Sequence, residues 1–264
     1  GSLAPLNGKI KATNGALPTL DRTPKLFIGG KQVRSDGQYT TPVYDPDGQV
    51  VGQVGDGNRK DIRDAVEAAH KASGWATRNG HARAQILYYI AENLSARADE
   101  FAKRIIAMTG TTAKSAQTEV ECAIDRLFTY AAYADKYGGT IQETPMRGLT
   151  IAVNEPIGVI GIACPDDNPL LAFVSLLAPA IARGNRVVII PSERYPLSAT
   201  DFYQVLETSD LPAGVVNIVT GNRDHLTKTL VEHDDVDAMW YFGTIEGSHF
   251  VEHASANNMK RTWV

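Results

Sequence analysis

Three groups of residues in this sequence could do chemistry. Asp166 and Asp167 form an adjacent pair of carboxylates, which could divide acid and base roles if their pKa values were pushed apart. Cys164, just before them, could act as a nucleophile. His249-Phe-Val-Glu-His253 matches H-x-x-E-H, in which two histidines one helical turn apart bind zinc and a glutamate acts as a base.

A structural explanation is favoured for each group. Asp166 and Asp167 directly precede Asn168-Pro169, which is typical of an N-cap and a first-turn proline, and acidic residues there favour the helix dipole. No histidine lies near Cys164 in the sequence, so a small buried hydrophobe is its default role. The histidine motif is followed by no carboxylate that could complete a zinc ligand set. The sequence therefore predicts no metal site.

The elements that would position these residues follow from a repeating alternation between Glu155 and Trp240. Short apolar runs alternate there with amphipathic segments of helical length, which predicts parallel strands covered by helices on both faces. The predicted strands span residues 157–163, 186–190, 215–219 and 236–241. This is a doubly wound α/β sheet, in which ligands bind beyond the carboxyl ends of the strands. The turns that follow the strands begin at Cys164, Pro191, Thr220 and Phe242.

The rest of the chain is predicted to surround this sheet. Residues 1–24 indicate a surface arm or linker, and residues 25–54 indicate two strand pairs that form a small peripheral sheet. Three helices follow: one capped by Asn58, a long one from about Gly80 to Gly110, and one from about Ser115 to Gly138. Residues 140–154 indicate two strands that project as a β-hairpin arm. The expected domain therefore comprises residues 25–139 and 155–264.

Composition excludes several classes of protein. The 264 residues are 43% hydrophobic and carry a formal net charge of −4 with interspersed signs, so no basic stripe indicates a nucleic-acid partner. No apolar run predicts a membrane span, and no signal peptide is evident. Cys122 and Cys164 form no C-x-x-C pair, which argues against a disulfide framework and favours a reducing cytoplasm.

Five blocks of sequence, in order, resemble the aldehyde dehydrogenase superfamily. The resemblance implies the Rossmann-like coenzyme-binding half of an NAD- or NADP-dependent enzyme that oxidises aldehydes to carboxylic acids. It also implies an oligomerisation arm at residues 140–154, so we expect another aldehyde dehydrogenase domain or subunit as partner and a homo-oligomer. The half that carries the family's nucleophilic cysteine and general base has no counterpart here. The blocks are Glu155-Pro-Ile-Gly-Val-Ile-Gly, Leu177-Ala-Pro-Ala-Ile-Ala-Arg-Gly-Asn, Pro191-Ser-Glu, Pro212-Ala-Gly-Val-Val-Asn-Ile-Val-Thr-Gly and His233-Asp-Asp-Val-Asp-Ala.

The sequence departs from the family pattern where chemistry is expected. Asp167 takes the place of the asparagine in the family's P-W-N-F-P turn, whose amide helps to form the oxyanion hole. A carboxylate about 3 Å from an oxyanion would repel it by roughly 5 kcal/mol at an effective dielectric constant of about 20. Ile190 replaces the lysine of K-P-[SA]-E, which binds the adenosine ribose or its 2′-phosphate. Pro191, Ser192 and Glu193 are kept, and Glu193 is either a ribose ligand or a solvated loop charge.

The family's pyrophosphate turn, F-T-G-S-T-E-V-G, aligns with residues 241–248. Gly243, Thr244 and Glu246 match, whereas Ser248 replaces the second glycine. A helix N-terminus can still accept an anion there. The resemblance thus implies coenzyme-binding roles for Pro191, Ser192, Glu193, Gly243 and Thr244, with weak binding of NAD or NADP.

Two functional hypotheses follow. The altered positions are similar to those expected of the degenerate second domain of the tandem family 16 aldehyde dehydrogenases, which would make this a non-catalytic structural and interaction domain. Alternatively, the chain is the working NAD(P)-binding half of an active aldehyde dehydrogenase that sequence beyond Val264 completes. The altered Asp167 and Ile190 favour the first hypothesis, and the retained Gly243 and Glu193 support the second.

Overall fold

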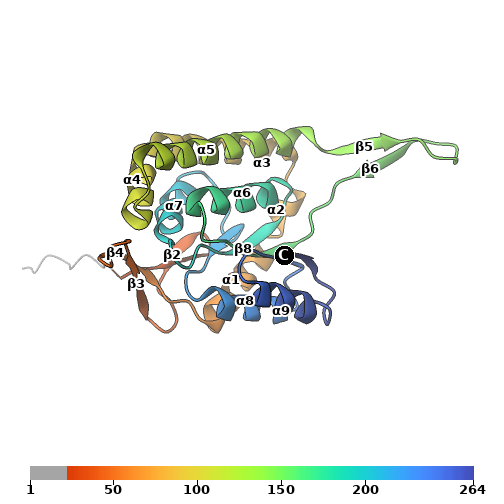
Figure 1. The fold of residues 1–264 in the computed structure, drawn as a ribbon. Coiled ribbons are helices and arrows are strands. Elements are labelled where there is room, and N and C mark those ends of the chain that lie inside the picture. Colours follow the sequence, from red (N-terminus) through yellow and green to blue (C-terminus); the bar gives the residue numbers. More distant parts are fainter. Residues whose placement is uncertain (1–22) are drawn as a thin grey trace, which may run out of the picture.

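The computed structural model describes residues 23–264, so the arm expected at residues 1–24 lies almost wholly outside the described residues. Helices cover both faces of a central sheet, and a hairpin projects to one side (Figure 1). The strands are β1 Leu26–Ile28, β2 Lys31–Val33, β3 Thr40–Tyr44, β4 Val50–Gly55, β5 Gly139–Gln142, β6 Thr150–Val153, β7 Val159–Ala163, β8 Arg186–Ile190, β9 Val216–Ile218, β10 Ala238–Tyr241 and β11 Arg261–Trp263. The helices are α1 Arg59–Lys71, α2 Gly74–Thr77, α3 Gly80–Ala96, α4 Ala98–Thr109, α5 Ala113–Lys136, α6 Pro169–Ala182, α7 Leu197–Glu207, α8 Arg223–Glu232 and α9 Ile245–Ser255.

The predicted doubly wound sheet is confirmed. In the main sheet of the described residues the order is β11-β10-β7-β8-β9-β1-β2, and the pairs β10–β7, β7–β8 and β8–β9 are all parallel. Alternate strand residues belong to different cores: Ile160 and Ile162 pack with α3 to α7, whereas Val159 and Ala163 pack with α1, α8 and α9. Both faces of β7 and of β8 are thus buried, which explains their continuous apolar runs.

The expected peripheral sheet is only partly correct. β3 and β4 form a separate antiparallel pair, but β1 pairs antiparallel with β9 and, with β2, extends the central sheet. Two long-range contacts hold β1 there: Phe27 stacks on Tyr203 at 5.4 Å, and Gly29 N donates to Asn217 Oδ1 at 2.9 Å. At the opposite edge β11, which the sequence did not reveal, pairs parallel with β10.

The single long helix expected from Gly80 to Gly110 is wrong, because the chain breaks at Arg97. Its backbone leaves the helical region, with φ −112° and ψ 14°, and this residue ends α3 and begins α4. The Arg97 guanidinium lies over the Phe101 ring at 5.5 Å and binds Glu100. The break turns α4 so that Phe101 and Ile105 still enter the core. Gly110 ends α4 in the left-handed region, as predicted.

The projecting arm is formed by β5 and β6, which pair with each other in antiparallel register (Figure 1). Apolar side chains on it are open to solvent: Ile141 is 73%, Leu149 72% and Ile151 55% exposed. No other strand of the described residues pairs with the arm. Elsewhere in residues 23–264, no helix has the length and apolarity that crossing a membrane requires.

Candidate functional site

The turns after β7, β8, β9 and β10 meet at one edge of the sheet, as expected for parallel strands. This edge brings together Asp166 after β7, Ser192 and Glu193 after β8, Arg223 after β9 and Gly243 after β10. The sequence predicted the meeting of these turns. It did not show how their side chains would bond to one another.

Asp166 is the acceptor around which three of these turns are joined. Its Oδ1 accepts hydrogen bonds from Ser192 Oγ at 2.7 Å and from Arg194 N at 3.2 Å, while Oδ2 lies 3.3 Å from the Arg223 guanidinium. Burial alone would raise the pKa of the Asp166 carboxyl, but these partners outweigh it and hold the pKa below its ordinary value. The helix-capping explanation of Asp166 is therefore wrong, because its carboxylate is directed to the β8 turn.

A different residue caps α6. Asn168 lies in the left-handed region, with φ 49°, and its side chain makes no capping hydrogen bond. Glu119, which α5 contributes, accepts the backbone N–H of Leu170 at 2.9 Å and that of Leu171 at 3.2 Å. Burial raises the pKa of the Glu119 carboxyl, and the two backbone hydrogen bonds offset this rise only in part. Glu119 thus fixes the start of α6, next to the exposed Asp167.

Arg223 fills the centre of the site. Its Nη1 donates to the carbonyl oxygen of Cys164 at 3.0 Å as well as to Asp166, and only 12% of the side chain is exposed. A Cβ atom placed on Gly243 would lie 3.0 Å from Arg223 Nε, so the guanidinium is packed against the glycine. Nε itself is buried and has no hydrogen-bond partner. The space in front of Gly243 is therefore occupied by two of the chain's own side chains, Arg223 and Tyr241.

Ser192 and Glu193 are also engaged within the chain. Ser192 is buried, donates to Asp166 and accepts from Tyr195 N at 2.9 Å. The two Glu193 oxygens accept from Asn222 Nδ2 and from Arg223 N, both at 2.9 Å. Glu193 thus binds the N-terminus of α8, where a negative charge is favourable. Its carboxylate is directed at this helix rather than left free for a sugar hydroxyl.

The turn from β10 to α9 is organised by Tyr241. Its hydroxyl donates to Asp224 at 2.7 Å and accepts from Thr244 N at 3.0 Å, while Thr244 Oγ1 caps α9 by accepting from Gly247 N at 3.0 Å. A Cβ atom on either Gly243 or Gly247 would overlap the Tyr241 hydroxyl. Both glycines are therefore required by internal packing. A pocket of about 260 Å³ lies between α8 and α9, with Tyr241, Thr227 and Phe250 in its wall.

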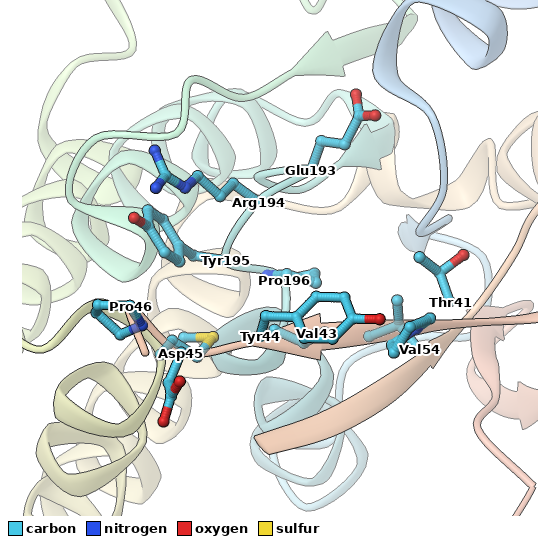
Figure 2. A pocket seen from close by; sticks show the side chains of 12 residues that line it. Thr41, Val43, Tyr44, Asp45, Pro46, Val54, Glu193, Arg194, Tyr195 and Pro196 are labelled. Atoms are coloured by element: carbon cyan, nitrogen blue, oxygen red, sulfur yellow. The ribbon is translucent and has the colours of Figure 1, made fainter. Parts of the chain in front are cut away.

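A second cavity, of about 290 Å³, lies between the β3–β4 pair and the segment that follows β8 (Figure 2). Tyr44, Arg194 and Tyr195 line it, and the Arg194 guanidinium lies over the Tyr195 ring at 5.2 Å. Asp45 also lines this cavity, and its carboxylate accepts hydrogen bonds from the backbone N–H groups of Asp47 and Gln49 in the hairpin turn. The cavity wall contains no free nucleophile with an adjacent base, so we assign no chemistry to it.

The other chemical candidates are not assembled into sites. Cys164 is fully buried, and burial raises the pKa of its thiol, so the reactive thiolate is disfavoured. His249 and Glu252 of the H-x-x-E-H motif face solvent on α9, 3.7 Å apart. Across residues 23–264 we find no group of three or more histidine, cysteine, aspartate or glutamate side chains placed to hold a metal ion.

Comparison with known proteins gives the family. The model of the aldehyde dehydrogenase family matches residues 33–264. The chain belongs to the aldehyde dehydrogenase family. An aldehyde dehydrogenase of Agaricus bisporus is 33% identical over 241 residues, which are 89% of this chain and 48% of that protein. An NADP/NAD-dependent aldehyde dehydrogenase of Escherichia coli is 32% identical over 91% of this chain and 50% of its own length.

A solved structure supports the same membership. The betaine aldehyde dehydrogenase of Staphylococcus aureus in complex with NAD+ superposes with a TM-score of 0.85 at 26% identity, over 90% of this chain and 48% of that one. This aldehyde dehydrogenase chain therefore spans about half the length of such relatives.

Sequence reasoning missed Arg223, Tyr241 and Glu119 as organising residues. Arg223 begins α8, directly after the turn that follows β9, so the rule that ligands bind beyond strand ends drew attention to its neighbourhood. Tyr241 stands where the family motif has phenylalanine, and its added hydroxyl was the available signal. Glu119 carried no signal, since an acidic residue within a helix is usually on a solvated face.

Proposed function

We propose that this chain is a non-catalytic structural and interaction domain of an aldehyde dehydrogenase family protein that oxidises aldehydes to carboxylic acids. One observation carries the proposal: the residues that the resemblance would use to hold the coenzyme are bonded within the chain. Ser192 binds Asp166, Glu193 binds the start of α8, and Arg223 covers Gly243. In this arrangement the residues do not fit a dinucleotide.

Asp167 supports the same proposal. It takes the position of the family's oxyanion asparagine, it is exposed, and an ionised carboxylate can accept hydrogen bonds but not donate one. The removal of one oxyanion donor costs about 3–4 kcal/mol of transition-state stabilisation, and a carboxylate adds repulsion. The position is thus unsuited to acyl chemistry.

The position of this domain within a larger protein is part of the proposal. Residues 25–139 and 155–264 would form the coenzyme-type domain, and residues 140–154 its oligomerisation arm. Asp167, Ile190 and Ser248 favour the degenerate second domain of a tandem family 16 protein. A cytoplasmic location is supported by the cysteine usage and by a relative named cytosolic 10-formyltetrahydrofolate dehydrogenase from Mus musculus, 34% identical over 92% of this chain.

A second candidate function is the working coenzyme-binding half of an active aldehyde dehydrogenase. The observation that favours it is the pocket between α8 and α9, which lies beside the Thr244-capped N-terminus of α9. Backbone N–H groups at a helix N-terminus attract phosphate. In this alternative NAD or NADP binds after Arg223 and Glu193 move.

Calorimetric titration separates the two functions. For the structural domain we expect dissociation constants for NAD and NADP of about 1 mM or weaker. We also expect no aldehyde-dependent formation of NADH by the purified chain, because within residues 23–264 no thiolate, base and oxyanion donor converge on one point. Binding in the micromolar range would instead establish the second function.

We further propose that the arm at residues 140–154 pairs with a strand of another aldehyde dehydrogenase domain or subunit, which includes a second copy of this chain in a homo-oligomer. An isolated two-stranded unit is marginally stable in water, and an exposed strand edge invites pairing. The exposed Ile141, Leu149 and Ile151 supply an apolar surface for the partner.

Sedimentation of Ile151→Pro tests the arm. Proline removes a backbone donor from β6 and is not tolerated inside a paired strand, so we expect self-association to weaken by about tenfold or more. Arg147→Pro, in the loop between β5 and β6, is the matched control and should associate like the wild type. An unchanged association state in Ile151→Pro would show that the arm is not the contact.

A further inference from the structure

We propose that Arg223 is the side chain that excludes a dinucleotide from the groove at the carboxyl ends of β7 and β10. The inference rests on the proposed function and assigns the loss of coenzyme binding to one residue. It follows from what touches Arg223 on each side. The guanidinium lies between the β7 turn, through Cys164 and Asp166, and Gly243 at the start of the α9 turn.

Arg223 blocks the groove sterically. Glycine allows close approach to a backbone, and a phosphate that binds at the N-terminus of α9 would approach through the space in front of Gly243. Arg223 Nε reaches that space, 3.0 Å from a Cβ built on Gly243, beside the Tyr241 hydroxyl, which the same Cβ would overlap. With 12% of its side chain exposed, Arg223 is held in the groove rather than extended into solvent.

The charge of the Arg223 guanidinium also matters, because an arginine could serve as a phosphate ligand. Here Nη1 donates to the Cys164 carbonyl and to Asp166, and the adjacent carboxylate balances the guanidinium charge. The pKa of Asp166 is held below its ordinary value partly by this arginine, so the carboxylate stays ionised and keeps Arg223 in place. A phosphate would have to break both hydrogen bonds and would meet the Asp166 charge. The geometry therefore favours exclusion.

Arg223 can be removed without leaving the Asp166 carboxylate unsatisfied. Asp166 retains hydrogen bonds from Ser192 Oγ and Arg194 N, and its side chain is 34% exposed. The Arg223 backbone N–H still donates to Glu193. Arg223→Ala is thus expected to fold, to keep the α8 start and to open the groove.

Calorimetric titration of NAD and of NADP into the wild type and Arg223→Ala tests the inference, with the melting temperature as a check of folding. We expect Arg223→Ala to bind about tenfold more tightly, or better, than the wild type. Arg59→Ala, which removes an exposed arginine from the first turn of α1, is the matched control and should bind as weakly as the wild type. If Arg223→Ala does not fold, Arg223→Met gives the same reading, because it keeps an apolar side chain in the groove but lacks the guanidinium and leaves Asp166 unchanged.

The outcomes distinguish the inference from the proposed function. A folded Arg223→Ala that binds no better than the wild type overturns the inference and leaves the structural-domain proposal standing. A wild type that already binds with micromolar affinity, and loses it in Arg223→Ala, overturns both and makes Arg223 a phosphate ligand. An equal gain in Arg59→Ala would also overturn the inference, since the gain would then not depend on the position of Arg223.

Discussion

Replacement of Glu119 by leucine is expected to lower the free energy of unfolding by about 2–5 kcal/mol. The Leu170 N–H is buried and the Leu171 N–H is half-buried, and both would lose their acceptor at the start of α6. Urea denaturation measures the loss. A change below 0.5 kcal/mol would show that Asn168 or water can replace Glu119 as the cap.

Glu119→Gln is the matched control, because its side-chain oxygen can accept the same hydrogen bonds without a charge. Since the pKa of Glu119 is raised in the folded protein, its protonated form is favoured there. This contribution to stability is fully present below the ordinary glutamate pKa of 4.5 and is lost as the pH rises through the folded value. We therefore expect the wild type to lose stability relative to Glu119→Gln over that range. A difference that is constant with pH would contradict the raised pKa.

Gly247→Val is expected to destabilise the fold by about 1–3 kcal/mol, although valine is the family's residue at this position. The new Cβ would overlap the Tyr241 ring and hydroxyl beneath the first turn of α9. Gly74→Val is the matched control, because no atom lies within 4 Å of a Cβ built there, and its effect should stay within about 0.5 kcal/mol. Denaturant unfolding of both variants makes the comparison.

Tyr241→Phe provides the second arm of a double-mutant cycle. Alone it removes the hydrogen bonds to Asp224 and Thr244 N, so it should itself cost about 1–3 kcal/mol. Combined with Gly247→Val, it restores the phenylalanine and valine of the family motif. The double variant should therefore be destabilised by about 0.5–3 kcal/mol less than the sum of the two single variants. Strict additivity of the two costs would mean that the Tyr241 hydroxyl is not the reason that glycine is required at position 247.

The parts of the fold that the sequence predicted are those set by local pattern. The strands around Ile160 and Val188 are apolar on both faces because two cores need them, and the Asn58 cap has its partner, Asp61, three residues away. The break at Arg97 has no glycine or proline to mark it. The pairing of β1 with β9 joins residues that are far apart in the sequence, so it depends on the fold of the whole chain and no local pattern predicts it.

The same division applies to the candidate site. The sequence predicted that the turns bearing Ser192, Glu193, Gly243 and Thr244 would meet, because carboxyl ends of parallel strands share an edge. It could not show that Arg223 would turn toward β7, since that direction is set by Asp166 and Cys164 in a turn far away in sequence. Residues of a retained motif can therefore lie at the expected strand ends while their hydrogen bonds are made to other residues of the same chain.

The pairing of β1 with β9 has a consequence for biosynthesis. Phe27 leaves the ribosome long before Ile218, the residue opposite it in the sheet, has been translated. Until then the apolar side chains of β1, and the backbone groups on the side away from β2, are open to other chains, which is the condition that favours misassembly. The side of β1 that faces β9 is thus made early and covered late, so the nascent chain carries an open strand until β9 has been translated.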